Sequence, residues 1–391
     1  MFFCLDIKSD SLLKSFLLIC FMNRLAFITD CLYNSAGMER VLTVCANALS
    51  DMYDITIITA FQHGRPDYYQ LSDNITRYDL QIAENVSGKQ KKLNYKNVLA
   101  SYLRKERYDI VVSLGGMDFD FLYGIKDGSK KIVWFHFAID IAETTWAGPN
   151  PSALRRIKSK LQTWKRIYHA RQFDKIVVVS KADLKKWERF THKALCIYNP
   201  ITITNSKLSA RTEKSVISVG RLDFQKGYDY LINAWQLVAS KHSEWHLNIF
   251  GEGNLRGELQ SQIDRLGLSN SITLCGRTSR IEEEYVKHSI FVLSSRAEGF
   301  GLVLVEAASC GLPLVSFDCP SGPSELVLNG KNGFLVDKVG DVSEMARCIC
   351  NLIEDEELRK KMGVEAQEFS KLFHIENTVP QWNALFASVN S

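Results

Sequence analysis

The chain has 391 residues, 46% of them hydrophobic and 24% charged, and a formal net charge of +4. The length predicts two or three domains, and the composition is that of a globular protein rather than a disordered or fibrous one. The small net charge gives no reason to expect a nucleic-acid partner. Ten cysteines without a C-x-x-C pair fit a reducing cytoplasm better than a disulfide framework.

Residues 11–21 form an apolar run that is too short to span a bilayer and lacks the small-residue cleavage site of a signal peptide. A new strand-like pattern begins after Met22. We therefore expect residues 1–21 to be an extension of doubtful structure in front of the folded domain, with a membrane anchor as the alternative.

Strand-like and helix-like stretches alternate through the first half. Strands are expected at 25–29, 55–59, 110–114, 131–135 and 175–179, and helices at 38–49, 92–107 and 153–172. Alternation at this spacing indicates parallel βαβ units. Asn199-Pro200 ends the pattern, and residues 202–214 look like a polar linker.

The second half repeats this style. Strands are expected at 216–219, 247–250, 271–274, 290–293, 314–317 and 333–336, and helices at 228–241, 342–353 and 356–372. Asp341 and Glu344 have the spacing of a capping box at a helix start. The sequence therefore predicts an α/β protein with two doubly wound, Rossmann-like domains.

The most informative segment is Arg296-Ala-Glu298-Gly-Phe-Gly301-Leu-Val-Leu-Val-Glu306, which has two carboxylates eight positions apart. It follows a strand-like run and continues into a helix-like one. Unpaired N–H groups at a helix N-terminus bind phosphate, whereas carboxylates accept hydrogen bonds from hydroxyls. The segment therefore suits a ligand that is part phosphate and part sugar.

A second segment, Gly220-Arg221-Leu-Asp-Phe-Gln-Lys226-Gly227, follows the expected strand 216–219. Arg221 and Lys226 flank a turn at the carboxyl end of that strand, where ligands bind in open α/β sheets. A guanidinium fork and an ammonium group both suit a diphosphate. The alternative is two surface cations in a loop.

These two segments resemble the paired-glutamate motif and the phosphate-binding turn of family 4 glycosyltransferases, which are retaining enzymes of the GT-B fold. The resemblance is specific over residues 215–372 and looser over 22–200. It implies two Rossmann-like domains facing across a cleft. Residues 22–200 would form the acceptor-side domain, joined by a C-terminal helix at 375–391, and residues 201–374 would bind the nucleotide-sugar.

The resemblance also implies functions for single residues. Arg221 and Lys226 would hold the donor diphosphate, with the backbone N–H groups of Gly301 and Leu302. Glu306 would accept hydrogen bonds from the ribose and Glu298 from the donor sugar. The remaining expected donor-binding residues are Gly37, Gly299 and Phe300. Gly37 belongs to a turn after the first strand, where this chain has Ala36 in place of the family's first glycine.

His136 ends the expected strand 131–135 and is followed by Asp140. Family members carry a histidine at this place that contacts the donor sugar near the reacting carbon, so His136 is a candidate catalytic residue with Glu298, Arg221 and Lys226. The alternative for His136 is a packed core residue.

The reaction so implied is that of a hexosyltransferase-type enzyme. A sugar would pass from a nucleotide diphosphate to a hydroxyl of a saccharide or lipid-linked saccharide, in the assembly of cell-surface polysaccharide, lipopolysaccharide or glycolipid. Retention would follow a front-face route in which the departing phosphate helps to take the acceptor's proton. No cofactor and no metal are expected. The alternatives are a nucleotide-sugar epimerase of the same fold and a non-enzymatic two-lobed binding protein.

Two short motifs offer competing interpretations. Asp118-Phe119-Asp120 is formally the D-x-D of the GT-A glycosyltransferases, which neutralise the diphosphate with a divalent metal. The alternative is that these residues open a helix after Gly115-Gly116. Gly251-Glu-Gly253 imitates a dinucleotide fingerprint, but its third glycine falls one position late. We expect a turn near the nucleotide there, and another at Gly276-Arg277.

The expected helix at 153–172 contains seven Lys/Arg residues and no acidic residue. Its apolar residues recur at helical spacing: Leu154, Ile157, Leu161, Trp164, Ile167 and Tyr168. A basic amphipathic helix suits an anionic membrane surface, whereas a solvated helix would pack its apolar face on the sheet. Both interpretations stay open. We expect a cytoplasmic protein, peripheral on the inner face of the membrane if this helix binds there.

Overall fold

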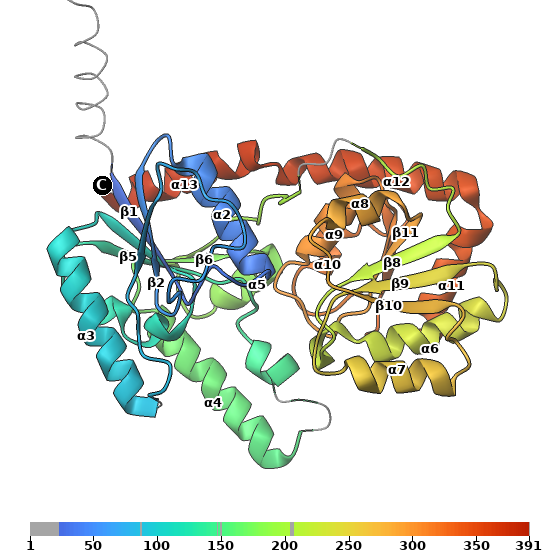
Figure 1. Ribbon diagram of the computed structural model, residues 1–391, viewed down its shortest axis with the longest axis horizontal. Coiled ribbons are helices and arrows are strands. Elements are labelled where there is room, and N and C mark those ends of the chain that lie inside the picture. Colours follow the sequence, from blue (N-terminus) through green and yellow to red (C-terminus); the bar gives the residue numbers. More distant parts are fainter. Residues whose placement is uncertain (1–22, 87, 147, 149–150, 204–206, 391) are drawn as a thin grey trace, which may run out of the picture. The chain divides into compact units, whose positions relative to one another are not determined.

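The computed structural model describes residues 23–86, 88–146, 148, 151–203 and 207–390. The extension expected at residues 1–21 lies outside this range. The chain forms two sheets, each with helices on both sides (Figure 1). The two sheets confirm the predicted α/β class with two Rossmann-like halves.

The first sheet has the strand order β3-β2-β1-β4-β5-β6-β7. The strands are β1 (Arg24–Thr29), β2 (Asp54–Thr59), β3 (Thr76–Asp79), β4 (Ile110–Ser113), β5 (Lys130–Trp134), β6 (Lys175–Val178) and β7 (Ala194–Cys196). β1 pairs in parallel with β2 and β4, with Leu25 opposite Ile55 and Ile110. Leu25, Ala26, Phe27 and Ile28 of β1 are fully buried. Burial on both faces is typical of a parallel sheet covered by helices.

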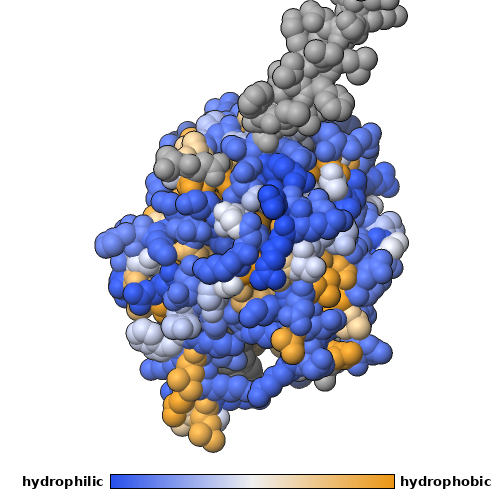
Figure 2. Space-filling model, turned by 90° about the vertical axis from the view of Figure 1, so that its left-hand side faces the viewer, coloured by the Kyte–Doolittle hydropathy of each residue, from blue (hydrophilic) through white to orange (hydrophobic). Residues whose placement is uncertain are grey.

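The helical elements of this half are α2 (Gly37–Leu49), α3 (Gly88–Glu106), η1 (Met117–Asp120), η2 (Leu122–Gly124), the π-helix η3 (Ala142–Trp146), α4 (Ala153–Ala170) and α5 (Lys181–Trp187). The face in Figure 2 is mostly hydrophilic, as water-facing helices should be. Hydrophobic side chains gather at its lower end, at the height of α4 in Figure 1.

The second sheet has the order β10-β9-β8-β11-β12-β13, all parallel. Its strands are β8 (Ser215–Val219), β9 (His246–Phe250), β10 (Ile272–Gly276), β11 (Ile290–Leu293), β12 (Leu314–Phe317) and β13 (Gly333–Val336). Its helical elements are η4 (Phe224–Lys226), α6 (Tyr228–Ala239), α7 (Arg256–Arg265), α8 (Ile281–Val286), α9 (Leu302–Ser309), α10 (Pro323–Leu326), α11 (Val342–Glu354), α12 (Glu356–Ser370), η5 (Lys371–Phe373) and α13 (Ile375–Asn390). The Asp341 carboxylate accepts from the Glu344 N–H at 3.0 Å and caps α11.

By contacts, the chain divides into two compact units. Of the described residues, the first unit holds 23–134, 169–176 and 379–390, and the second holds those within 135–168 and 177–378. In the first unit, the ring of Trp382 in α13 packs edge-on against Trp134 of β5, with centroids 4.7 Å apart. The end of the chain therefore contributes to the first unit. The domain boundaries expected from the sequence stay a prediction.

Candidate functional site

The turn between β8 and α6 lies against the end of β11. The Asp223 carboxylate accepts from the Lys226 N–H at 3.2 Å and caps η4. Gly227 follows with φ +63°, and a Cβ at this position would lie 2.2 Å from the carbonyl oxygen of Ser294. Only glycine permits such an approach of two backbones. The turn thereby places Lys226 beside the segment that begins at Ser294.

Lys226 and Glu298, two predicted site residues from distant segments, form an ion pair. Lys226 Nζ lies 2.7 Å from Glu298 Oε1, and their side chains are 13% and 8% exposed. Ser295 Oγ donates to the same carboxylate oxygen at 2.5 Å. The pair fixes both side chains in place, and a phosphate bound by Lys226 would share this cation with Glu298.

Arg221 is held more loosely. Its side chain is 69% exposed, and Nη2 lies 3.3 Å from Asp223 Oδ2 and 3.4 Å from Gln225 Oε1. Exposed pairs of this kind contribute little to stability, so the guanidinium can turn toward a ligand at low cost. The backbone beside it is firmly fixed, because the Leu222 N–H donates to the Glu252 carbonyl at 3.0 Å. The glycine turn at 251–253 therefore lies next to the Arg221 turn.

His136 lies against the Glu298 turn through its main chain. A Cβ on Gly299 would lie 2.1 Å from the His136 carbonyl oxygen. The two ring nitrogens of His136 have almost no contact with solvent. Burial lowers the pKa of His136 to about 3, so its imidazole is neutral at physiological pH. The structure thus places the main chain of His136 at this turn, and its neutral imidazole contributes no positive charge.

The N-terminus of α9 begins immediately after this turn. Gly301 precedes the helix with φ +95°, and Leu302 is the first helical residue. The first N–H groups of a helix have no intrahelical partner and carry a partial positive charge. The Phe300 ring is buried and packs near Tyr198 and Phe373, with ring centroids 5.7 and 5.6 Å away. This packing holds the helix start in place.

Glu306 lies two helical turns further and is buried. Its Oε1 accepts from Thr202 Oγ1 at 2.5 Å, and its Oε2 from the Tyr285 hydroxyl at 3.2 Å. A carboxylate accepts hydrogen bonds from hydroxyls, and this is the kind of contact expected with a ribose. The sequence predicted Glu306 but not its two hydroxyl partners.

Arg296 is a further site residue that the sequence analysis did not single out. Its guanidinium donates to both carboxylate oxygens of Asp229, at 2.8 and 2.6 Å. It lies between the rings of Phe224 and Tyr230, 4.2 and 4.1 Å from their centroids. Arg296 thus ties the Lys226 turn to the Glu298 segment. Its sequence signal was only its place at the start of the glutamate run.

The remaining candidates lie in the first unit. Gly37 is the first residue of α2, after an extended Ala36 without a side-chain cap. Asp118 and Asp120 open η1 after Gly116, as the alternative to a metal motif predicted. Burial raises the pKa of Asp118 to about 7, whereas Asp120 pairs with Lys92 Nζ at 2.6 Å.

Among the described residues, Asp118 and Asp120 do not belong to a cluster of three or more side chains that could hold a metal. In the described part of the chain, such a cluster is formed by His242, Cys350 and Glu354. The hypothesis of a D-x-D metal site therefore gains no support from the arrangement of Asp118 and Asp120.

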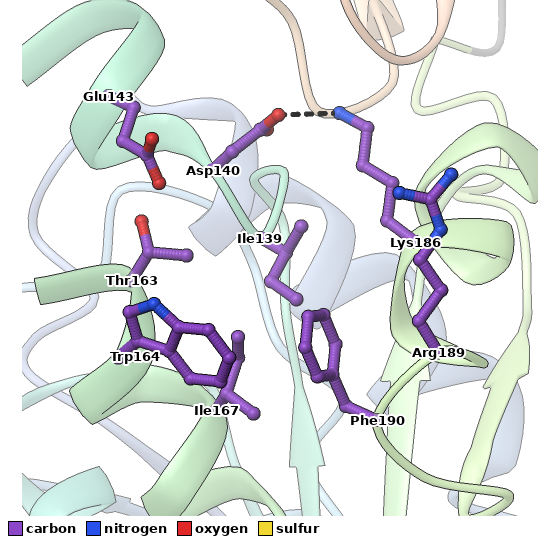
Figure 3. A pocket seen from close by; sticks show the side chains of 9 residues that line it. All are labelled: Ile139, Asp140, Glu143, Thr163, Trp164, Ile167, Lys186, Arg189 and Phe190. Carbon is purple, nitrogen blue, oxygen red and sulfur yellow. Dashed lines mark hydrogen bonds and ion pairs between the residues drawn. The ribbon is translucent and has the colours of Figure 1, made fainter. Parts of the chain in front are cut away.

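A pocket of about 220 Å³ lies in the second unit (Figure 3). Its lining residues are Ile139, Asp140, Glu143, Thr163, Trp164, Ile167, Lys186, Arg189 and Phe190. The Asp140 carboxylate pairs with Lys186 Nζ at 2.8 Å in this pocket, and the apolar part of the lining comes from Ile139, Trp164, Ile167 and Phe190. Asp140, which the sequence placed near His136, thus points into a pocket of its own.

The chain is similar to known proteins in sequence and in fold. The family model described as Glycosyltransferase Family 4 matches residues 35–205, and that described as Glycosyl transferases group 1 matches residues 201–369. An uncharacterized glycosyltransferase of Haemophilus influenzae is 28% identical over 370 residues, which cover 93% of this chain and 100% of the relative. The amylovoran biosynthesis glycosyltransferase AmsD of Erwinia amylovora is 25% identical, with 93% and 99% covered.

A solved structure extends the similarity to the fold. A TarM variant from S. aureus, in complex with fondaparinux, alpha-GlcNAc-glycerol and UDP, superposes with a TM-score of 0.78 at 18% identity, with 93% of this chain and 100% of that chain covered. The two family models together match residues 35–369, across both sheets. The chain is therefore a glycosyltransferase of family 4 with the GT-B fold.

Proposed function

We propose that this glycosyltransferase moves a sugar from a nucleotide diphosphate to an acceptor hydroxyl with retention of the anomeric configuration and without a required metal. The observation that carries the proposal is the Lys226–Glu298 contact of 2.7 Å, which lies between the Arg221 turn and the N-terminus of α9. This arrangement offers cationic groups for a diphosphate and a fixed carboxylate for a sugar.

The charges of the site suit a diphosphate leaving group. The bound diphosphate of a nucleotide-sugar carries two negative charges, and it gains another as the glycosidic bond breaks. Glu298 compensates much of the Lys226 charge, so Arg221 and the N–H groups of Gly301 and Leu302 supply the remainder. A helix N-terminus contributes the equivalent of about half a positive charge. These groups together would replace the metal that a GT-A enzyme uses.

Glu298 would act on the sugar and Glu306 on the ribose. As the glycosidic bond breaks, the sugar ring gains positive charge, and a carboxylate already fixed by Ser295 and Lys226 stabilises that charge without reorganising. His136 is neutral and lies at the same turn, so it would position the sugar through hydrogen bonds. In a front-face reaction, the departing phosphate would take the acceptor's proton.

The expected acceptor is a saccharide or lipid-linked saccharide of a cell-surface glycan. Two comparisons support it: the relative AmsD is named for amylovoran biosynthesis, and TarM binds UDP together with alpha-GlcNAc-glycerol. Such assembly starts from cytoplasmic nucleotide-sugars, which fits a protein peripheral on the inner face of the membrane. No observation on the site favours a nucleic-acid partner.

A panel of nucleotide-sugars, assayed for nucleotide release with and without acceptor mixtures, tests the proposal. We expect one donor to be consumed much faster than the others, with acceptor-dependent release of nucleoside diphosphate. Acceptor-independent release of an epimerised sugar would indicate an epimerase instead. Saturable donor binding without any turnover would indicate a binding protein.

A further inference from the structure

Helix α4 carries a continuous stripe of exposed apolar side chains. Leu154, Ile157, Leu161, Trp164 and Tyr168 are exposed by 80, 57, 63, 60 and 63%. They alternate in steps of three and four residues, which places them along one face of the helix. Hydrophobic side chains gather at the lower end of the face in Figure 2, at the height of the lower part of α4 in Figure 1. An ordinary surface helix turns such a stripe toward the protein core.

The opposite face of α4 is the one that the protein covers. Its buried residues are Ser159, Thr163, Arg166, Ile167 and Ala170. Arg166 even donates a hydrogen bond from Nη1 to the Ile139 carbonyl at 2.9 Å. The expectation that this helix packs its apolar face on the sheet is therefore wrong for all of its large apolar residues except Ile167. The outward stripe of large apolar side chains is thus exposed, which is typical of an interaction surface.

The charges beside the stripe select the kind of partner. Arg155, Arg156, Lys158, Lys160 and Lys165 are exposed on α4, and residues 153–172 contain no acidic side chain. If two copies of the chain paired through this stripe, like charges would face each other along the whole helix. An anionic bilayer offers an apolar layer for the stripe and negative head groups for the cations.

We propose that α4 lies in the interface of an anionic membrane, with the stripe (Leu154, Ile157, Leu161, Trp164 and Tyr168) inserted among the lipids and its cations at the head groups. Among the described residues, none of the helices combines the length and apolar character needed to cross a bilayer. The contact is therefore a surface one. It does not depend on which sugar the protein transfers.

The experiment measures co-sedimentation with vesicles of phosphatidylglycerol and phosphatidylcholine. Variant one replaces the apolar residues Leu154→Gln, Ile157→Gln and Leu161→Gln. Trp164 is left in place because its ring packs against Phe190, with centroids 5.6 Å apart, and lines the pocket of Figure 3. Variant two neutralises Arg155, Arg156, Lys158 and Lys160 to Gln. We expect each variant to bind at least about tenfold more weakly than the wild type.

Matched controls separate the stripe from general surface properties. The first control, Leu237→Gln with Val364→Gln, removes exposed apolar side chains elsewhere. The second control removes four exposed charges from α3, the same number as in variant two, by replacing Lys89, Lys96, Arg104 and Lys105 with Gln. Both controls should bind as the wild type does. Added salt should weaken vesicle binding by the same factor in the wild type and in variant one, because both retain the cations.

Several results would overturn the proposal. Wild-type binding by variant one would show that the stripe does not insert. Equal loss in the α3 control would show that binding follows net charge alone. Concentration-dependent dimerisation of the wild type that variant one abolishes, without vesicle binding, would assign the stripe to a second copy. Nucleotide release with a soluble acceptor is measured in parallel, and it should be unchanged in variant one whichever result is found.

Discussion

Replacing Glu298 by glutamine gives the most specific prediction about the site. The change keeps the shape of the side chain but removes its charge, while Lys226 Nζ at 2.7 Å and Ser295 Oγ at 2.5 Å can still donate to the amide oxygen. A hydrogen bond to a charged group contributes about 1–2 kcal/mol more than a neutral one. The change also leaves the largely buried Lys226 ammonium without its counter-charge, so the loss in unfolding free energy should reach about 3–5 kcal/mol. The folded fraction of the variant therefore has to be measured.

The effect on catalysis should persist when kcat is corrected for the folded fraction. If Glu298 faces a sugar that gains positive charge, its interaction is stronger in the transition state than in the ground state. We expect Glu298→Gln to lower kcat by about 2–4 kcal/mol of barrier, or about 30- to 1000-fold. Glu306→Gln is the matched control, because Glu306 is also buried but bound to the neutral hydroxyls of Thr202 and Tyr285. It should raise KM for the donor more than it lowers kcat.

Steady-state kinetics at saturating acceptor, with urea unfolding of each variant, would measure both effects. The reverse pattern, with kcat lost in Glu306→Gln and KM raised in Glu298→Gln, would refute the assignment of the two carboxylates. Native kinetics in both variants would refute it as well. A fall in kcat that disappears when corrected for the folded fraction would show that Glu298 serves only to neutralise Lys226.

Three further predictions concern the metal, the backbone and pH. EDTA should leave nucleotide release within about twofold of its rate, because Arg221, Lys226 and α9 meet the diphosphate charge; loss of activity with EDTA and its return with manganese would favour a metal mechanism. Gly299→Ala should lower kcat/KM by about 100-fold, since its Cβ would lie 2.1 Å from the His136 carbonyl oxygen, whereas Gly257→Ala, with nothing within 4 Å, should be silent. Because burial raises the pKa of Asp118 to about 7, its folded form keeps a proton that the unfolded form loses, so stability should fall as pH rises from about 4 to about 7. Asp118→Asn should flatten this part of the stability curve. The urea midpoint of each protein is measured at pH 5 and at pH 8, and the same change in midpoint for both proteins would contradict the argument.

Much of the fold could be predicted because buried parallel strands leave a strong local signal. The apolar runs at β1, β4, β8, β11 and β12 were all expected within one or two residues. β3, Thr76–Asp79, was missed because it is polar and mostly exposed. Helix α3 begins at Gly88, earlier than expected, since its first turn is basic and polar.

The site was predicted in its residue types but not in its contacts. Paired carboxylates, glycines and cations are visible in the order of residues, which is why Glu298, Glu306, Arg221 and Lys226 could be named. The Lys226–Glu298 pair joins residues 72 positions apart, and no local pattern encodes that distance. The orientation of α4 could not be predicted either. Its apolar periodicity is the same whether the stripe faces the core or the surroundings, and only the buried Ser159 and Thr163 decide.

The stereochemistry of the product tests the central claim most directly. The donor that the nucleotide-sugar panel identifies is incubated with acceptor, and the anomeric configuration of the new glycosidic bond is read by NMR at early times. Retaining transfer at the Arg221, Lys226 and Glu298 site predicts a product with the anomeric configuration of the donor, whose formation is lost in Glu298→Gln. An inverted product, or a retained one formed at an unchanged rate by Glu298→Gln, would contradict the account.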